Sequence, residues 1–188
     1  RQRLMRPQLG KDKILQAALS LFAQNGYHKT SMNEIAKGAG VSKGLTYNYF
    51  ESKQALLLAI IEQASKKMFD VAEKMSTPSD YKSMLKIFLD QYFLFLKNNK
   101  KYLSFQLSLL FQPDLKKIVE GPLQQRAERL LSNTVIMFRE AGASNPDLTA
   151  RRFMSELDGI ALHNLSVFKD YPLDEMHTQL FDNYKDLK

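Results

Sequence analysis

A group of cationic, hydroxyl and aromatic side chains lies at helical spacing near the N-terminus of the 188-residue chain. We expect Lys43, Thr46, Tyr47 and Tyr49 to face outward from a short helix that follows Gly40. Cations, hydroxyls and planar rings on one helix face suit phosphates and base edges in the major groove of DNA. The segment therefore predicts a surface that contacts nucleic acid.

Two short helices would position this group. The pattern Ser31-x-x-Glu34 is a capping box, which predicts a helix over residues 31–39 with Met32, Ile35, Ala36 and Ala39 facing inward. Gly40 stands where the following turn needs a residue without a β-carbon, and Ser42 caps the next helix. Val41, Leu45 and Phe50 are expected to fill the small core. This is the geometry of a helix-turn-helix.

The charge of the chain is concentrated in the same region. Residues 1–53 hold nine Lys and Arg against three Asp and Glu, a net +6 of the total +7. A basic module joined to a nearly neutral body favours a polyanion partner at one end, although a solvated basic tail is an alternative. The charge therefore divides the chain into a basic domain, residues 1–53, and a nearly neutral domain, residues 54–188.

Helical periodicity continues through the rest of the chain, and no segment alternates convincingly at period two. The fold class expected is all-α, with about nine helices. Thr77-Pro78-Ser79 is expected to separate two helices. Gly121-Pro122 is expected to begin a helix that ends at Gly142, and Asn145-Pro146 is expected to cap the next helix. The predicted helices cover residues 14–25, 31–39, 42–49, 52–75, 81–96, 101–112, 121–141, 145–168 and 173–184.

The composition argues against several other classes of protein. The chain has no Cys, and its three His residues show no metal-ligand spacing, so no metal and no cofactor are expected. No nucleophile elbow or phosphate loop is present, which indicates that the protein is not an enzyme. No apolar run approaches the ~20 residues that span a bilayer, so no membrane partner is expected. Arg1, Arg3 and Arg6 could contact DNA or form an arm without a role.

At this point the sequence resembles the TetR family of bacterial transcriptional regulators. The resemblance covers about residues 11–60. It is carried by Ala17-Ala18, Leu21-Phe22, Gly26-Tyr27, Thr30-Ser31-Met32, Ile35-Ala36, Ala39-Gly40-Val41-Ser42-Lys43-Gly44, Tyr47-Asn48-Tyr49-Phe50, Ser52-Lys53 and Leu56. The remaining two-thirds shows no recognisable motif, as is typical of a family whose ligand domains diverge.

The resemblance implies a DNA-binding domain over residues 1–53, which we call the head, and a ligand-binding and dimerisation domain over residues 54–188. It also implies a role for individual residues of the head. Thr30 and Ser31 would bind a phosphate, Tyr49 and Lys53 would hold the flanking DNA backbone, and Gly44 would let the helix approach DNA closely. Base choice would rest on Lys43, Leu45 and Thr46. Alternatives are a core position for Tyr47 and a solvated side chain for Lys53. The full DNA-binding set is Thr30, Ser31, Ser42, Lys43, Gly44, Leu45, Thr46, Tyr47, Asn48, Tyr49 and Lys53.

The C-terminal domain, residues 54–188, is rich in aromatic and aliphatic side chains, most of which are expected to belong to a hydrophobic core. The sharper hypothesis is an apolar cavity with a few polar groups that orient a small molecule. Asp158, His163 and Asn164 interrupt an apolar helix and could face this cavity, a dimer interface or a structural hydrogen bond. The candidate pocket residues are Phe88, Gln91, Tyr92, Phe95, Tyr102, Phe105, Leu109, Phe138, Asp158 and His163.

In the family the last two helices pair with their copies in a four-helix bundle. The candidate stripe here is Phe153, Leu157, Ile160, Ala161, Phe168, Met176, Leu180, Phe181 and Tyr184, with packing inside the chain as the alternative. The resemblance implies a cytoplasmic homodimer that binds a palindromic double-stranded DNA operator as a repressor. A small apolar effector would release the protein from DNA. The predicted helix over residues 52–75 would transmit the change, because it joins the pocket to the DNA-binding domain. An activator, or a regulator that needs a ligand or partner protein, is the alternative.

Overall fold

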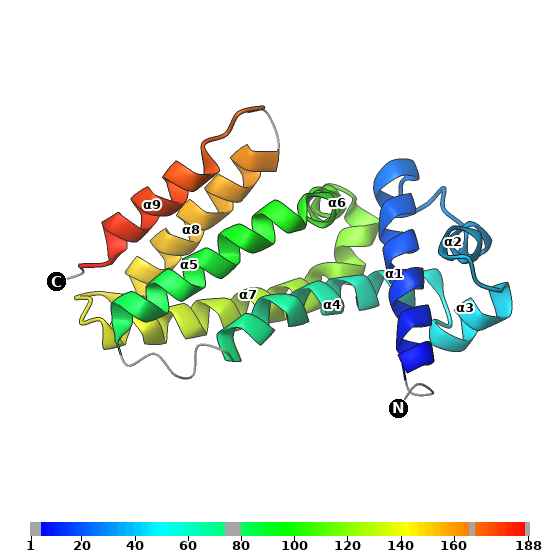
Figure 1. Ribbon diagram of the computed structural model, residues 1–188, viewed down its shortest axis with the longest axis horizontal. Coiled ribbons are helices and arrows are strands. Elements are labelled where there is room, and N and C mark those ends of the chain that lie inside the picture. The colour runs from blue at the N-terminus through cyan, green and yellow to red at the C-terminus, as the bar shows by residue number, and fades with distance from the viewer. Residues whose placement is uncertain (1–4, 74–79, 166–167, 187–188) are drawn as a thin grey trace. The chain divides into compact units, whose positions relative to one another are not determined.

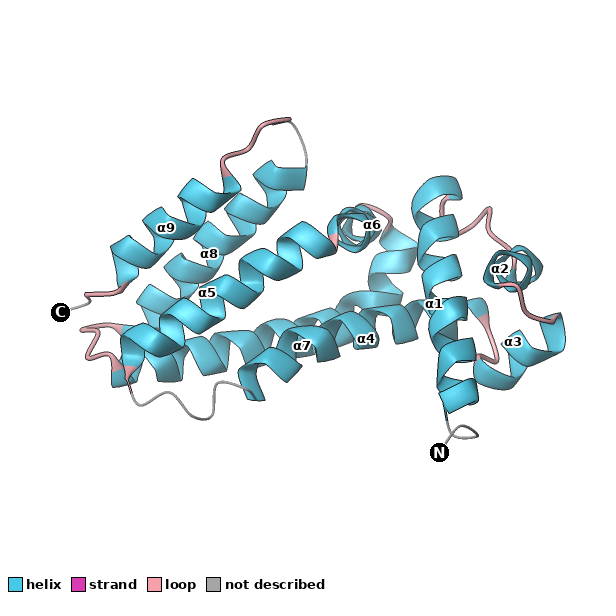
Figure 2. Ribbon diagram, viewed as in Figure 1, coloured by secondary structure: helices cyan, strands magenta, loops and turns pink. Residues whose placement is uncertain are grey.

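A computed structural model describes residues 5–73, 80–165 and 168–186, and over these ranges the chain forms helices and no strand (Figures 1 and 2). The all-α prediction is confirmed. The predicted break at residues 77–79, Arg1, Arg3 and the side chain of Arg6 lie outside the described residues. The helices are α1 (Met5–Asn25), α2 (Met32–Ala39), α3 (Lys43–Tyr49), α4 (Lys53–Glu73), α5 (Tyr81–Asn98), α6 (Lys100–Leu110), α7 (Pro113–Glu140), α8 (Pro146–Leu165) and α9 (Leu173–Tyr184).

Most helix ends lie where local sequence signals place them. Gly26, Gly40 and Gly142 have positive φ angles of 82°, 66° and 82°, so each takes the left-handed conformation that stops a helix. The Asn145 side chain accepts a hydrogen bond from the Leu148 N–H at 3.1 Å and caps α8. The backbone N–H of Ala55 donates to the Ser52 hydroxyl at 3.0 Å, as expected of a residue that caps α4.

The predicted start of a helix at Gly121-Pro122 is wrong. Pro122 lies inside α7, which begins at Pro113. Leu115 and Val119 are both fully buried, so tertiary packing favours a helix over residues that precede the proline. A proline inside a helix removes one backbone hydrogen bond and costs about 3 kcal/mol. Gly121 and Pro122 are both exposed.

The chain divides into two compact units. The first contains residues 1–64 and 101–122, and the second contains residues 65–100 and 123–188. The first unit thus extends beyond residue 53, and the functional division proposed from sequence remains a prediction. In the first unit α1 packs against α2 and α3. The Phe22 ring on α1 also stacks on the Phe105 ring on α6, with centroids 5.8 Å apart.

The second unit has an aromatic core. Phe138 on α7 is fully buried, and its ring lies 6.3 Å from Tyr81, 5.3 Å from Phe153 and 5.5 Å from Tyr184. The Tyr81 hydroxyl donates to the Tyr184 carbonyl at 2.8 Å and joins α5 to the end of α9. Within the described part of the chain, no helix combines the length and the apolar character that a membrane span requires.

This core corrects much of the predicted dimer stripe. Five of its members are at least nine-tenths buried inside the chain, so they cannot also contact a second copy. The predicted apolar stripe is present on α8 and α9, but these five side chains pack within the second unit. These five residues are Phe153, Leu157, Ile160, Leu180 and Tyr184. Ala161, Met176 and Phe181 are half-buried and Phe168 is exposed, so for these four the dimer role remains a prediction.

Candidate nucleic-acid interface

The helix-turn-helix of the head is held by caps at both ends of α2. The Glu34 N–H donates to the Ser31 hydroxyl at 3.2 Å, while the Ser31 N–H donates to the Glu34 carboxylate at 2.7 Å. The predicted capping box is therefore confirmed. Gly40 follows in the left-handed conformation, and its N–H donates to the Lys37 carbonyl at 3.1 Å. These bonds fix the turn from which α3 starts.

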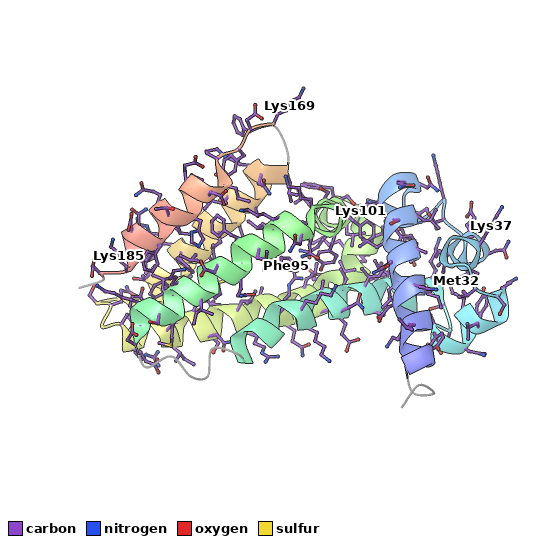
Figure 3. The ribbon with its side chains drawn as sticks, viewed as in Figure 1. Met32, Lys37, Phe95, Lys101, Lys169 and Lys185 are labelled. Atoms are coloured by element: carbon purple, nitrogen blue, oxygen red, sulfur yellow. The ribbon has the colours of Figure 1, made fainter. Side chains whose placement is uncertain are left out.

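Packing determines which side chains of α2 are buried. Met32, Ile35 and Ala36 are buried, as predicted, whereas Lys37 is exposed. In Figure 3, Lys37 extends away from the rest of the head. Phe50, which follows α3, is also buried, as expected for a residue of the small core, whereas Leu45 is 36% exposed, so the expectation that it fills this core is wrong. The surface of α3 is thus carried on a framework of buried apolar side chains.

One face of α3 is free of the core. Ser42 caps the helix by accepting a hydrogen bond from the Leu45 N–H at 3.1 Å. The Lys43 ammonium lies 5.9 Å from the centre of the Tyr47 ring, within reach of a cation–π contact. The exposed members of the predicted set are Ser42, Lys43, Gly44, Leu45, Tyr47 and Asn48. Tyr47 is 44% exposed, which argues against the core alternative for its ring.

The expectation that Thr46 faces outward is wrong. Thr46 is fully buried, and its hydroxyl donates to the Ser42 carbonyl at 3.3 Å. A side chain in this position cannot reach a base edge. Tyr49 is half-buried, and a β-carbon added to Gly10 on α1 would lie 3.5 Å from its hydroxyl. Tyr49 therefore packs partly against α1.

The groups expected to bind a phosphate at α2 already have partners. The Thr30 side chain is buried, and its hydroxyl donates to the carbonyls of Gly26 at 2.9 Å and Leu21 at 3.3 Å. Both the N–H and the hydroxyl of Ser31 donate to the Glu34 carboxylate, at 2.7 and 2.8 Å. These hydrogen bonds lower the pKa of Glu34, so a negative charge stands where the phosphate was predicted. Thr30 therefore has a structural role in this turn, while Ser31 is exposed and the phosphate role of both residues remains a prediction.

Lys53 also differs from its predicted surroundings. Its ammonium donates to the carbonyls of Tyr27 at 2.8 Å, Thr30 at 2.9 Å and His28 at 3.3 Å. The side chain is half-buried, which argues against the solvated alternative, while the contact with the DNA backbone remains a prediction. Sequence analysis missed this carbonyl site. A lysine at the first residue of a helix opposes the helix dipole, but its spacing in sequence does not mark the carbonyls that it binds.

The predicted pocket residues are divided between the two units. Tyr102, Phe105 and Leu109 are buried in the first unit, and Phe138 belongs to the aromatic core of the second. All four are packed inside their own units, and their role in a pocket remains a prediction. His163 is exposed on α8, and its ring lies 5.4 Å from that of Phe168.

Partly accessible rings remain along α5. Phe88, Gln91, Tyr92 and Phe95 are half-buried there, and the Phe88 and Tyr92 rings stack with centroids 6.3 Å apart. Figure 3 marks Phe95 on α5. The Tyr92 hydroxyl donates to the Leu157 carbonyl on α8 at 3.0 Å. These contacts keep the polar end of Tyr92 paired while part of its ring stays accessible.

Two of the polar groups predicted to interrupt α8 are Asp158, which adds to the effect of burial in raising the pKa of the nearby Tyr92 phenol, and Asn164. Loss of solvent around Asp158 raises the pKa of its carboxyl, and the positive charge of Arg126 partly opposes that rise. The amide nitrogen of Asn164 is buried and has no hydrogen-bond partner among the described residues. A buried donor without a partner is costly, so the Asn164 amide fits a site for an acceptor atom, whereas Asp158 is exposed.

Two short helices joined at a left-handed glycine, with a third helix packed across them, define the helix-turn-helix class of DNA-binding folds. Residues 14–60 match the family described as "Bacterial regulatory proteins, tetR family". This match confirms, over residues 14–60, the resemblance to the TetR family that was stated from the sequence.

The wider comparisons agree with this assignment. The chain is 35% identical over 131 residues to YuxN of Bacillus subtilis, an HTH-type transcriptional regulator; the match covers 63% of this chain but only 44% of YuxN. A protein from Saccharomonospora viridis in complex with choline superposes with a TM-score of 0.76 at 22% identity, over 92% of this chain and 93% of that one. The fatty acid degradation regulator FadR from Bacillus halodurans gives 0.72 at 21% identity, over 93% and 96%.

Proposed function

We propose that this protein is a ligand-responsive repressor that binds a palindromic operator as a homodimer, with α3 of each copy in a major groove. The observation that carries the proposal is the exposed face of α3, where Lys43, Leu45, Tyr47 and Asn48 stand clear of the core. The lysine can donate to guanine acceptors, the asparagine can pair with adenine, and the leucine can contact a thymine methyl group. The concentrated positive charge of residues 1–53 supports the same partner.

Binding-site selection from a randomised duplex pool tests the operator. We expect a palindrome whose half-sites lie roughly 34–36 Å apart, one turn of DNA. Changing Lys43 or Asn48 to Ala should weaken binding to the selected duplex by about five- to a hundredfold, and binding to unrelated DNA much less. Lys100→Ala, at an exposed site on α6, is the charge control. Selection that enriches no sequence refutes the proposal.

The dimer proposal concerns the C-terminal helices. Leu162 on α8 and Phe168 beyond it are 45% and 55% exposed, and Ala161, Met176 and Phe181 are half-buried. A second copy that covers these side chains would bury apolar surface and give the two-fold symmetry a palindrome requires. Native mass spectrometry should show a dimer, and Leu162→Glu should shift it to monomer. A monomeric wild-type protein at micromolar concentration would contradict this part.

The effector proposal concerns the accessible rings of α5. Phe88, Tyr92 and Phe95 offer an apolar surface, and Asp158 and Asn164 offer polar groups nearby on α8. The structural relatives bind or regulate different chemistry, choline in one case and fatty acid degradation in the other. We therefore propose a small, mainly apolar effector without choosing between these chemistries. A screen for compounds that release the selected duplex tests it, with Phe88→Ala and Tyr92→Ala expected to lose the response.

A further inference from the structure

The Lys53 ammonium occupies a cradle of backbone carbonyls. It donates to Tyr27, His28 and Thr30, and it lies 4.4 Å from the centre of the Tyr27 ring. All three hydrogen-bonding positions of an ammonium group can be filled by these acceptors. Such a side chain has no donor left for another ligand unless the cradle opens.

The cradle joins the two ends of the helix-turn-helix. Tyr27, His28 and Thr30 lie in the turn that leads into α2, whereas Lys53 is the first residue of α4, directly after α3. The hydrogen bonds therefore close a segment of 23 to 26 residues that contains both helices. A constraint across such a segment removes conformational freedom from everything within it.

The same turn is held from its other side. The Thr30 hydroxyl donates to Leu21 and Gly26 at the end of α1, and the Thr30 N–H donates to the Tyr27 carbonyl at 3.3 Å. Burial lowers the pKa of Lys53, and the nearby Glu34 carboxylate opposes that shift. A partly buried ammonium bound to carbonyls is consistent with a structural role and less so with a mobile surface cation.

We infer that Lys53 is a positioning residue: its ammonium, bound to the Tyr27, His28 and Thr30 carbonyls, sets the orientation of α2 and α3 for DNA and does not itself contact a phosphate. The inference rests on the proposed DNA-binding function. It replaces the phosphate role that the family resemblance implied for this lysine. Counterion release separates the two roles, because each lost phosphate contact reduces the slope of log K against log salt by about one unit.

The test compares Lys53→Met, Lys43→Met and Lys66→Met in the full chain, on the duplex selected by the wild-type protein. For Lys53→Met we expect a Tm lower by roughly 3–10 °C, affinity weaker by about fivefold or more, and an unchanged salt slope. Lys43→Met, at the exposed lysine proposed to contact a base, should weaken binding to the selected duplex by about fivefold or more with no loss of Tm. Lys66→Met, at an exposed site on the same helix α4, should change none of the three.

Other outcomes overturn the inference. A slope lowered by about one unit in Lys53→Met identifies a phosphate ligand, whatever happens to Tm. A lower Tm with unchanged affinity identifies a purely structural residue. If the variant does not fold, ¹⁵N spectra of the wild-type lysine ammonium groups decide: we expect the Lys53 signal to exchange slowly with and without DNA and to keep its shift. Failure of the wild-type protein to select any duplex would instead refute the proposed function.

Discussion

Two glycines of the head should respond to alanine in opposite ways. A β-carbon added to Gly40 or to Gly44 would meet no atom within 4 Å, so space does not distinguish them. Gly40 has a φ of 66°, in the left-handed region, whereas Gly44 lies inside α3. The difference between the two substitutions is therefore one of backbone conformation alone.

The magnitudes follow from this difference. An alanine held in the left-handed conformation costs about 1–2 kcal/mol, so Gly40→Ala should destabilise the protein by that amount. An alanine in a helix is more stable than glycine by about 0.5–1 kcal/mol, so Gly44→Ala should stabilise it. For a chain of this size each kcal/mol moves Tm by roughly 2–4 °C. Thermal unfolding of the two variants beside the wild type measures both shifts.

DNA binding gives the second half of the prediction. Gly44 lies at the exposed start of α3, where the proposed interface brings the helix backbone close to DNA. A methyl group there should weaken binding to the selected duplex by about tenfold, a cost of roughly 1.4 kcal/mol. Gly44→Ala would then be the more stable and the weaker-binding protein. Unchanged affinity would refute the close approach of α3, and a lower Tm would refute its helical geometry.

Three further predictions concern α7, the aromatic core and the capping box. Pro122→Ala should restore a helical hydrogen bond and raise stability by up to about 3 kcal/mol in urea unfolding, and a loss of stability would show that the proline is required. Phe138→Ala should cost about 3–5 kcal/mol in the same assay, whereas Phe111→Ala, at a 79% exposed ring, should cost less than about 0.5. The Glu34 pKa is lowered by its bonds from Ser31, so its contribution is present above the pKa of an unfolded carboxyl and is lost as pH falls through the folded value. Glu34→Gln should therefore flatten the acid side of the stability–pH profile, and a profile parallel to that of the wild type would contradict the assignment.

Local chemistry predicted the helix ends of the head well. Ser31, Gly40 and Ser42 act through bonds to residues at most four positions away, so their neighbours in sequence decide the outcome. Gly121-Pro122 failed as a helix start because Leu115 and Val119 pack the preceding turns into the fold. The balance between a local signal and burial cannot be read from spacing alone.

The functional surface was predicted less completely, for two physical reasons. Helix α3 has only seven residues, too few for periodicity to fix its inward face, and Thr46 was therefore placed outside when it lies inside. The acceptors of Lys53 are carbonyls, which every residue carries and no sequence pattern marks. The stripe that includes Phe153 and Tyr184 was recognised, but an apolar stripe does not reveal whether its partner lies in the same chain.

The separation between the framework of the head and the exposed face of α3 has a consequence for how this protein could evolve. Lys43, Leu45, Tyr47 and Asn48 contribute little to the buried core, so exchanging them should alter stability by only about 0.5 kcal/mol. Successive mutations at these sites could retarget the head to a new promoter through intermediates that all remain folded. Adaptation of the regulator would then be limited by recognition alone, and gene duplicates could diverge quickly.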